Sequence, residues 1–173
     1  MGRISPRGRC DFLLHHTSKG KGLSTMSLGE ATQPIEMLLV EDNPGDVRLT
    51  TEALKEAEQG INLSVVADGV EALAFLRKQG KYADSARPHL ALLDLNLPKK
   101  NGHEVLEEIK FDPDLRGIPV VVLTTSQSDN DIRRAYELGA NCCITKPTDL
   151  DSFIRVMESI QSIWLTAARL PAD

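Results

Sequence analysis

Five short apolar runs recur along the chain, and continuous apolar character is typical of strands that are covered on both faces of a sheet. The runs at residues 37–40, 90–93, 120–123 and 142–145 end at or next to a polar residue, whereas the run at 63–66 leads to no residue of obvious chemistry. Amphipathic stretches of helical length lie between the runs. Strand and helix therefore alternate, which predicts an α/β fold: a five-stranded parallel sheet with helices on both faces.

The starts of several helices are marked as well. Asn43 stands directly before Pro44, so it is predicted to cap the first helix, which Pro44 opens. Ser128 and Thr148 are each followed three positions later by Asp, which is the spacing of a capping box. The last amphipathic stretch covers residues 150–168 and predicts a long closing helix.

Residues with chemical potential stand at the carboxyl ends of four predicted strands: Glu41-Asp42, Asp94, Thr124 and Lys146. Because ligands of such sheets bind beyond the carboxyl ends of the strands, we expect these five residues to converge. Three carboxylates and one ammonium leave an excess of two negative charges, which favours entry of a divalent cation. All-oxygen ligands without His or Cys favour magnesium over zinc or copper.

The pattern predicts a phosphoryl-transfer site. Magnesium would be bound by Asp42 and Asp94, with Glu41 as a direct or water-mediated ligand. Asp94 would also be the nucleophile and form an acyl phosphate. Lys146 would neutralise the phosphoryl oxygens, and the Thr124 hydroxyl would donate a hydrogen bond to one of them. Taken singly, each residue has a simpler interpretation as a solvated loop residue, a helix cap or an ordinary strand residue, and only their joint presence favours a site.

At this spacing the acidic pair, Asp94, Thr124 and the Lys146-Pro147 dipeptide resemble the site of two-component response regulator receiver domains, in the CheY-like superfamily. The resemblance implies a flavodoxin-like, doubly wound sheet of strand order 2-1-3-4-5. It also implies that a sensor histidine kinase transfers a phosphoryl group to Asp94. A backbone carbonyl of Asn96 would complete the magnesium shell, and the Lys146–Pro147 peptide would be cis.

Within that family, the segments 41–49, 93–98 and 141–147 and the pair Trp164-Leu165 resemble the small single-domain regulators paired with bacterial phytochrome kinases. One departure concerns Cys143, because many receivers carry Tyr or Phe there as a rotamer switch. A thiol cannot swing as a ring does, so the report of phosphorylation is expected to run through Thr124 and the loop that follows it.

Other functions fit the same residues less well. A haloacid-dehalogenase-type aspartyl phosphatase would carry a second Asp two positions after the nucleophile, where this chain has Asn96. A flavodoxin-like electron carrier would need a phosphate loop where Glu41-Asp42 would repel phosphate. A receiver fold used as a scaffold, independent of phosphorylation, stays open. The chain is expected to catalyse only its own phosphorylation and dephosphorylation, so it is not predicted to be an enzyme with an external substrate.

Composition divides the chain into two predicted parts. Residues 1–33 are rich in Gly, Ser, Thr, Arg and Lys and predict a disordered basic extension, whereas residues 34–169 form the receiver domain. Translation from Met26 would make residues 1–25 an artefact of start-site choice. The net charge is −5, and residues 1–25 carry +4, which leaves −9 on the remainder and disfavours nucleic-acid binding.

Location and assembly follow from the apolar residues and the cysteines. No apolar run is long enough for a membrane span, and three cysteines fit a reducing compartment, so a cytoplasmic protein without membrane association is predicted. Cys142 and Cys143 are neighbours on a strand, so they are expected to face opposite helix layers. The apolar end of the last helix, Ile163 to Leu165, predicts a homodimer interface as an alternative to simple core packing.

Overall fold

The computed structural model describes residues 34–55 and 60–170, so the predicted extension 1–33 and the alternative start at Met26 lie outside the described residues. None of the helices in the described ranges is long and apolar enough to cross a membrane. The elements follow in this order: β1 Ile35–Val40, α1 Pro44–Lys55, β2 Ile61–Val66, α2 Gly69–Leu76, η1 Gly80–Tyr82, β3 Leu90–Asp94, α3 Gly102–Phe111, β4 Val120–Thr124, α4 Asp129–Glu137, β5 Cys142–Thr145, α5 Leu150–Ile160 and η2 Gln161–Ala167.

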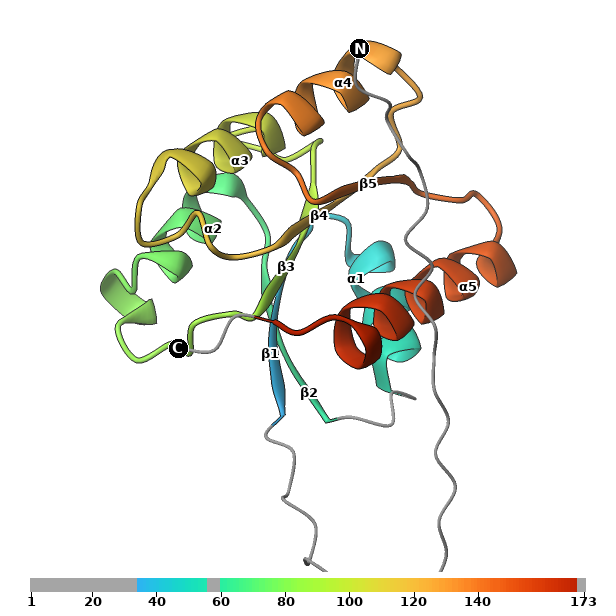
Figure 1. The fold of residues 1–173 in the computed structure, drawn as a ribbon, viewed down its shortest axis with the longest axis horizontal. Coiled ribbons are helices and arrows are strands. Elements are labelled where there is room, and N and C mark those ends of the chain that lie inside the picture. Colours follow the sequence, from blue (N-terminus) through green and yellow to red (C-terminus); the bar gives the residue numbers. More distant parts are fainter. Residues whose placement is uncertain (1–33, 56–59, 171–173) are drawn as a thin grey trace, which may run out of the picture. The chain divides into compact units, whose positions relative to one another are not determined.

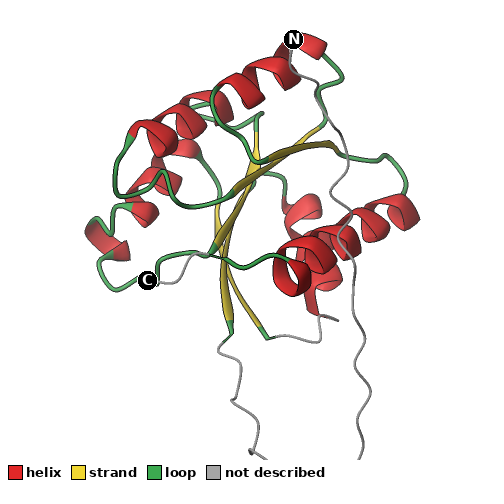
Figure 2. Ribbon diagram, viewed as in Figure 1, coloured by secondary structure: helices red, strands yellow, loops and turns green. Residues whose placement is uncertain are grey.

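The sheet has five strands, all paired in parallel, in the order β2-β1-β3-β4-β5. Helices α1 and α5 cover one face, and α2, α3 and α4 cover the other (Figure 1). The same three layers are evident when helices and strands are coloured separately (Figure 2). The predicted flavodoxin-like topology is therefore confirmed, and the carboxyl ends of β1, β3, β4 and β5 meet at one edge.

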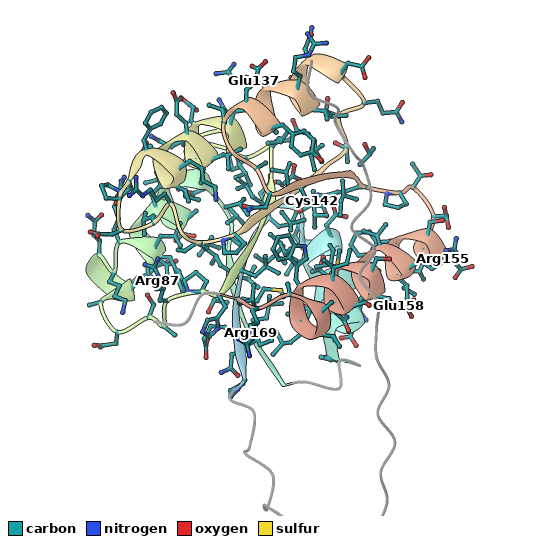
Figure 3. The ribbon with its side chains drawn as sticks, viewed as in Figure 1. Arg87, Glu137, Cys142, Arg155, Glu158 and Arg169 are labelled. Atoms are coloured by element: carbon teal, nitrogen blue, oxygen red, sulfur yellow. The ribbon has the colours of Figure 1, made fainter. Side chains whose placement is uncertain are left out.

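Alternation along each strand divides the core into two layers. Leu38 of β1 belongs to the cluster under α2, α3 and α4, whereas Met37 belongs to the cluster under α1 and α5. On β5, Cys143 packs against the first cluster and Cys142 against the second, as predicted from their adjacency. Figure 3 shows Cys142 among the interior side chains, whereas Glu137 and Arg155 project from the outer faces of α4 and α5.

Most helix starts agree with the sequence prediction, and one does not. The Asn43 side chain accepts a hydrogen bond from the second amide of α1 at 2.8 Å, and Ser128 caps α4. The predicted cap at Thr148 is wrong, because Asp149 caps α5 and accepts from the Ser152 amide at 2.8 Å. Asp149 immediately precedes the helix in extended geometry, and its carboxylate also favours the positive end of the helix dipole.

The closing helix ends in a π-helical segment, η2, instead of remaining α-helical to residue 168. Leu165 is buried there and Trp164 packs against the core under α1 and α5, whereas Ile163 is 56% exposed. Core packing therefore accounts for two of the three apolar residues at this end. The homodimer interface stays a prediction, with Ile163 as its remaining exposed apolar residue among the three.

Gly102 brings the start of α3 into close contact with the strand end that carries Asp94. Its amide donates to the Leu95 carbonyl at 2.9 Å. A Cβ atom at this position would collide with the Asp94 carbonyl oxygen and the Leu95 Cα, both of them backbone atoms that have little freedom to move. Only glycine therefore permits α3 to begin against the carboxyl end of β3.

We expect Gly102→Ala to lower the free energy of unfolding by about 1–3 kcal/mol, because the added methyl group overpacks a rigid contact. Urea unfolding monitored by circular dichroism measures the change. Gly117→Ala is the matched control, since its Cβ would meet no atom within 4 Å. That variant should be neutral or more stable by up to ~1 kcal/mol. Equal stability of the two variants would contradict the close-contact argument.

Candidate functional site

The four strand ends bring together most of the predicted site. Asp94 and Thr124 are the last residues of β3 and β4, while Glu41 and Lys146 directly follow β1 and β5. The backbone amide of Lys146 donates to the Thr124 carbonyl at 2.7 Å, which extends the β4–β5 pairing by one residue. Lys146 thereby enters the edge of the sheet beside the neighbouring strand ends.

The Lys146 ammonium is the centre of the cluster. Its Nζ donates to Glu41 Oε2 at 2.5 Å, Asp94 Oδ2 at 2.6 Å and Asp46 Oδ2 at 2.8 Å. The side chains of Lys146, Glu41 and Asp94 are 5%, 3% and 6% exposed, and that of Asp46 is 28% exposed. Three carboxylates thus share one ammonium, with a formal excess of two negative charges.

Burial and charge act against each other on the ionisable groups of this cluster. Burial raises the pKa of the Glu41 carboxyl above its usual value, although the hydrogen bond and charge of Lys146 oppose the shift. Burial also disfavours the charged form of Lys146. The hydrogen bonds to Asp46, Asp94 and Glu41 outweigh it, so the pKa of Lys146 is raised and the ammonium stays protonated at neutral pH.

Both buried carboxylates are fixed through both of their oxygens. Asp94 Oδ1 accepts from the Asn96 amide at 2.9 Å, and Glu41 Oε1 accepts from the Asn43 amide at 3.1 Å. The other oxygen of each binds Lys146. The Asn96 side chain is directed to Thr125 Oγ1 at 3.1 Å, so it ties the β3–α3 loop to the β4–α4 loop. The Asp94 carboxylate is therefore held in a single orientation.

Asp42 does not join the cluster as predicted. Its side chain is exposed and makes no hydrogen bond or ion pair within the described residues. Glu41 and Asp42 are consecutive residues directly after β1, but Glu41 is buried and reaches Lys146, whereas Asp42 is exposed to solvent. Across residues 34–55 and 60–170, no three His, Cys, Asp or Glu side chains are arranged as a metal-binding group.

The donor chemistry nevertheless fits a hard divalent cation. The cluster offers only oxygen donors, and one ammonium leaves its carboxylates under-neutralised. In the present arrangement, three carboxylate oxygens converge on Lys146 Nζ instead of on a common metal position. A cation would have to share the carboxylates with that ammonium.

Thr124 connects the site to α4. Its side chain is buried, and Oγ1 accepts from the Ser126 amide at 3.0 Å. Ser126 Oγ in turn donates to Asp131 Oδ2 at 2.6 Å, in the first turn of α4. The predicted hydrogen bond from Thr124 to a phosphoryl oxygen stays a prediction. The hydrogen bonds made by Ser126 connect Thr124 to α4 through the loop after β4. That phosphorylation is reported along this loop stays a prediction.

A ring does reach β5, but it comes from α4. The hydroxyl of Tyr136 accepts a hydrogen bond from the Cys143 amide at 3.1 Å, and the tyrosine is half-exposed. The sequence shows that position 143 lacks an aromatic residue, but it gives no sign that Tyr136 reaches the strand. Seven positions of helix and turn separate Tyr136 from Cys143. Helix α4 is therefore tied to the sheet at both ends.

The predicted cis peptide before Pro147 is wrong, since no peptide bond in the described ranges is cis. The trans form is the intrinsically favoured isomer of an X–Pro bond. Lys146 reaches all three carboxylates from this trans backbone.

Asp46 is the residue of the cluster that sequence reasoning missed. An acidic residue in the first turn of a helix is ordinarily explained by the helix dipole, so Asp46 gave no separate indication of a site. The available clue was its place in the first turn of α1, the helix that begins at the sheet edge where β1 ends.

The response regulator receiver domain family matches residues 37–158 of this chain. The chain belongs to this family. Response regulator Rcp1 of Synechocystis sp. (strain ATCC 27184 / PCC 6803 / Kazusa) is 50% identical over 143 residues, which make up 83% of this chain and 97% of that protein. The present chain is therefore a response regulator of the Rcp1 type, and it belongs to a two-component system.

Solved structures agree with this assignment. The Mn²⁺-bound form of Rcp1 superimposes with a TM-score of 0.78 at 50% identity, over 80% of this chain and 100% of that one. The phosphorylated cyanobacterial phytochrome response regulator RcpA gives a TM-score of 0.79 at 49% identity, over 80% and 99% of the respective chains. Receiver domains bind Mg²⁺ or Mn²⁺ in their acidic pocket.

We expect Lys146→Ala to lower the free energy of unfolding by about 3–5 kcal/mol at pH 7, because Glu41 and Asp94 lose their shared buried counter-charge. Without the ammonium, burial raises the pKa of the Glu41 carboxyl further above its usual value. Protonation then removes the penalty, so the deficit should shrink as the pH falls from 7 to 5. Urea unfolding at several pH values measures it.

Lys55→Ala provides the control for this experiment, because it removes a lysine whose ion pair with Glu52 is mostly exposed. Solvent screens such a pair, so the change should be small at both pH values. A deficit in Lys146→Ala that stays constant with pH would contradict the assignment of the penalty to ionised Glu41 and Asp94.

Proposed function

We propose that this receiver domain accepts a phosphoryl group on Asp94 from a phosphohistidine of a sensor histidine kinase. The observation that carries the proposal is the Asp94 carboxylate itself. It ends β3, is buried, and is held by Lys146 Nζ at 2.6 Å and by the Asn96 amide at 2.9 Å. A buried, pre-oriented carboxylate beside a cation meets the needs of nucleophilic attack on phosphorus.

In the proposed step an Asp94 carboxylate oxygen attacks the phosphorus atom of the phosphohistidine. The new P–O bond forms while the P–N bond breaks, and the bonding electron pair returns to the imidazole nitrogen. Lys146 stabilises the negative charge on the transferring oxygens. The Thr124 hydroxyl would donate a hydrogen bond to one of them, while its oxygen still accepts from the Ser126 amide.

The metal ligands we assign are Glu41, Asp42, Asp94 and the backbone carbonyl of Asn96. Magnesium bound there would add positive charge beside the transferring phosphoryl group. Glu41 and Asp94 support this assignment through their position at the buried edge. Asp42 would have to turn its exposed carboxylate towards them, and this would break no hydrogen bond or ion pair within the described residues.

The partner we infer is a phytochrome-type histidine kinase, because RcpA is a phytochrome response regulator by name and is 49% identical to this chain. A pocket of about 450 Å³ next to the cluster, lined among others by Asp46, Lys146 and Pro147, supports access for the donor side chain. Helix α1 and the loop after β5 border it. A cytoplasmic location, a homodimer through the closing helix, and the absence of nucleic-acid and membrane binding belong to the same proposal.

We expect Asp94→Asn to abolish phosphoryl labelling by acetyl phosphate and magnesium, because an amide lacks the nucleophilic oxygen charge. Intact mass and peptide mapping measure the adduct. Wild-type protein should carry one phosphoryl group on Asp94. No adduct should form when a chelator is present during the incubation. Asp114→Asn, an exposed acid in the α3–β4 turn, should label as wild type does.

Equal labelling of Asp94→Asn and wild type would refute the assigned acceptor. A wild-type protein that is folded, binds magnesium and forms no adduct would favour the alternative interpretation, a receiver fold that acts as a phosphorylation-independent scaffold. The dehalogenase-type alternative has no support in the site, because Asn96 occupies the position of its second acid and is directed to Thr125.

A further inference from the structure

Asp46 is the one carboxylate on the Lys146 ammonium to which the proposed chemistry gives no role. It lies in the first turn of α1, 100 positions before the lysine, and its Oδ2 accepts from Lys146 Nζ at 2.8 Å. It also lines the 450 Å³ pocket beside the cluster. Asp46 therefore contacts both the pocket and the buried Lys146 ammonium.

The number of N–H donors on the ammonium limits how many acceptors Lys146 can bind. An ammonium has three N–H donors, and the three carboxylates Glu41, Asp46 and Asp94 take one each. A phosphoryl group on Asp94 brings further anionic oxygens to the same position. Lys146 must release one of its present acceptors in order to donate to the phosphoryl group.

Burial decides which acceptor is released. The Glu41 side chain is 3% exposed, so its release would leave a buried carboxylate oxygen without a partner. The Asp94 side chain is 6% exposed, and the carbonyl oxygen that stays unesterified in its acyl phosphate would likewise be buried without a donor. The Asp46 side chain is 28% exposed, and water from the adjoining pocket can replace the lost hydrogen bond. Asp46 is thus the acceptor whose release costs least.

We propose that Asp46 is a positioning residue that holds the Lys146 ammonium in competition with the phosphoryl group and is released from it when Asp94 is phosphorylated. The proposal rests on the proposed function of Asp94 as phosphoryl acceptor. Only hydrogen-bond acceptors are exchanged at Lys146, and no proton is transferred. With acetyl phosphate as donor, a P–O bond to Asp94 forms, the P–O bond to the acetyl oxygen breaks, and acetate leaves with the electron pair.

Neutralising Asp46 should therefore favour phosphorylation. In Asp46→Asn the competing negative charge is gone, so Lys146 can move to the transferring phosphoryl group at lower cost. We expect labelling by acetyl phosphate to be about threefold to tenfold faster than in wild type, as for removal of one partly screened charge beside the reacting group. The experiment uses the full chain at saturating magnesium, so that weaker metal binding does not mask the effect.

Asp149→Asn is the matched control. Asp149 lines the same pocket and undergoes the same change of charge, but it binds the Ser152 amide instead of Lys146. Asn is also a good N-cap, so α5 should stay capped. The control should label at the wild-type rate, and Asp46→Glu, which restores the charge, should return the rate towards wild type.

A Lys146→Ala background tests whether Asp46 acts through the lysine. Lys146→Ala is expected to label more slowly than wild type, and adding Asp46→Asn to it should change its rate little. This double-mutant comparison isolates the pairwise effect from general effects of charge or stability. Circular dichroism and thermal unfolding establish that each variant is folded.

The outcomes separate the two proposals. No adduct on wild-type Asp94 would overturn the proposed function. Labelling of wild type with an unchanged or slower rate in Asp46→Asn would overturn the role of Asp46 alone. An equal acceleration in Asp149→Asn, or in the Lys146→Ala background, would show a general charge effect and would also overturn it. If Asp46→Asn does not fold, Asp46→Ala, which also removes the charge, takes its place: faster labelling than wild type would support the proposal, and an unchanged or slower rate would overturn it.

Discussion

A single buried ammonium determines how the functional edge of this domain is built. Lys146 neutralises carboxylates that come from three separate elements, the β1–α1 loop, the first turn of α1 and the end of β3. Two of these carboxylates are almost fully buried, and a carboxylate in that position without a cation would carry a large desolvation penalty. The fold must therefore bring Lys146 Nζ within hydrogen-bonding distance of all three carboxylates. The strand order, the start of α1 and the end of β5 together achieve this.

Much of this arrangement could be predicted from the sequence. Continuous apolar runs located the strands, and the rule that strand ends converge placed Glu41, Asp94, Thr124 and Lys146 at one edge. The exceptions depend on side-chain direction, which strand patterns determine only partly. Asp42 and Glu41 are adjacent, and one of them had to face solvent. Asp46 was not predicted, because an acidic residue in the first turn of a helix is already explained by the helix dipole.

The contacts around α4 explain how a receiver without an aromatic residue at position 143 remains linked to its site. Thr124, Ser126 and Asp131 form a continuous series of hydrogen bonds from the sheet edge into the first turn of α4. Tyr136, near the other end of that helix, accepts from the β5 backbone. The same helix is thus fixed to two neighbouring strands, which is a suitable arrangement for coupling a change at Thr124 to the outer surface.

The distances along the chain between Lys146 and its partners also constrain the order of folding. Glu41 and Asp94 precede the lysine by 105 and 52 positions, and every strand of the parallel sheet pairs with a sequence-distant neighbour. During synthesis both carboxylates exist long before their counter-ion. Until β5 docks, that edge must stay hydrated, because uncompensated charge cannot be buried. The cluster can therefore close only after β5 has docked beside β4.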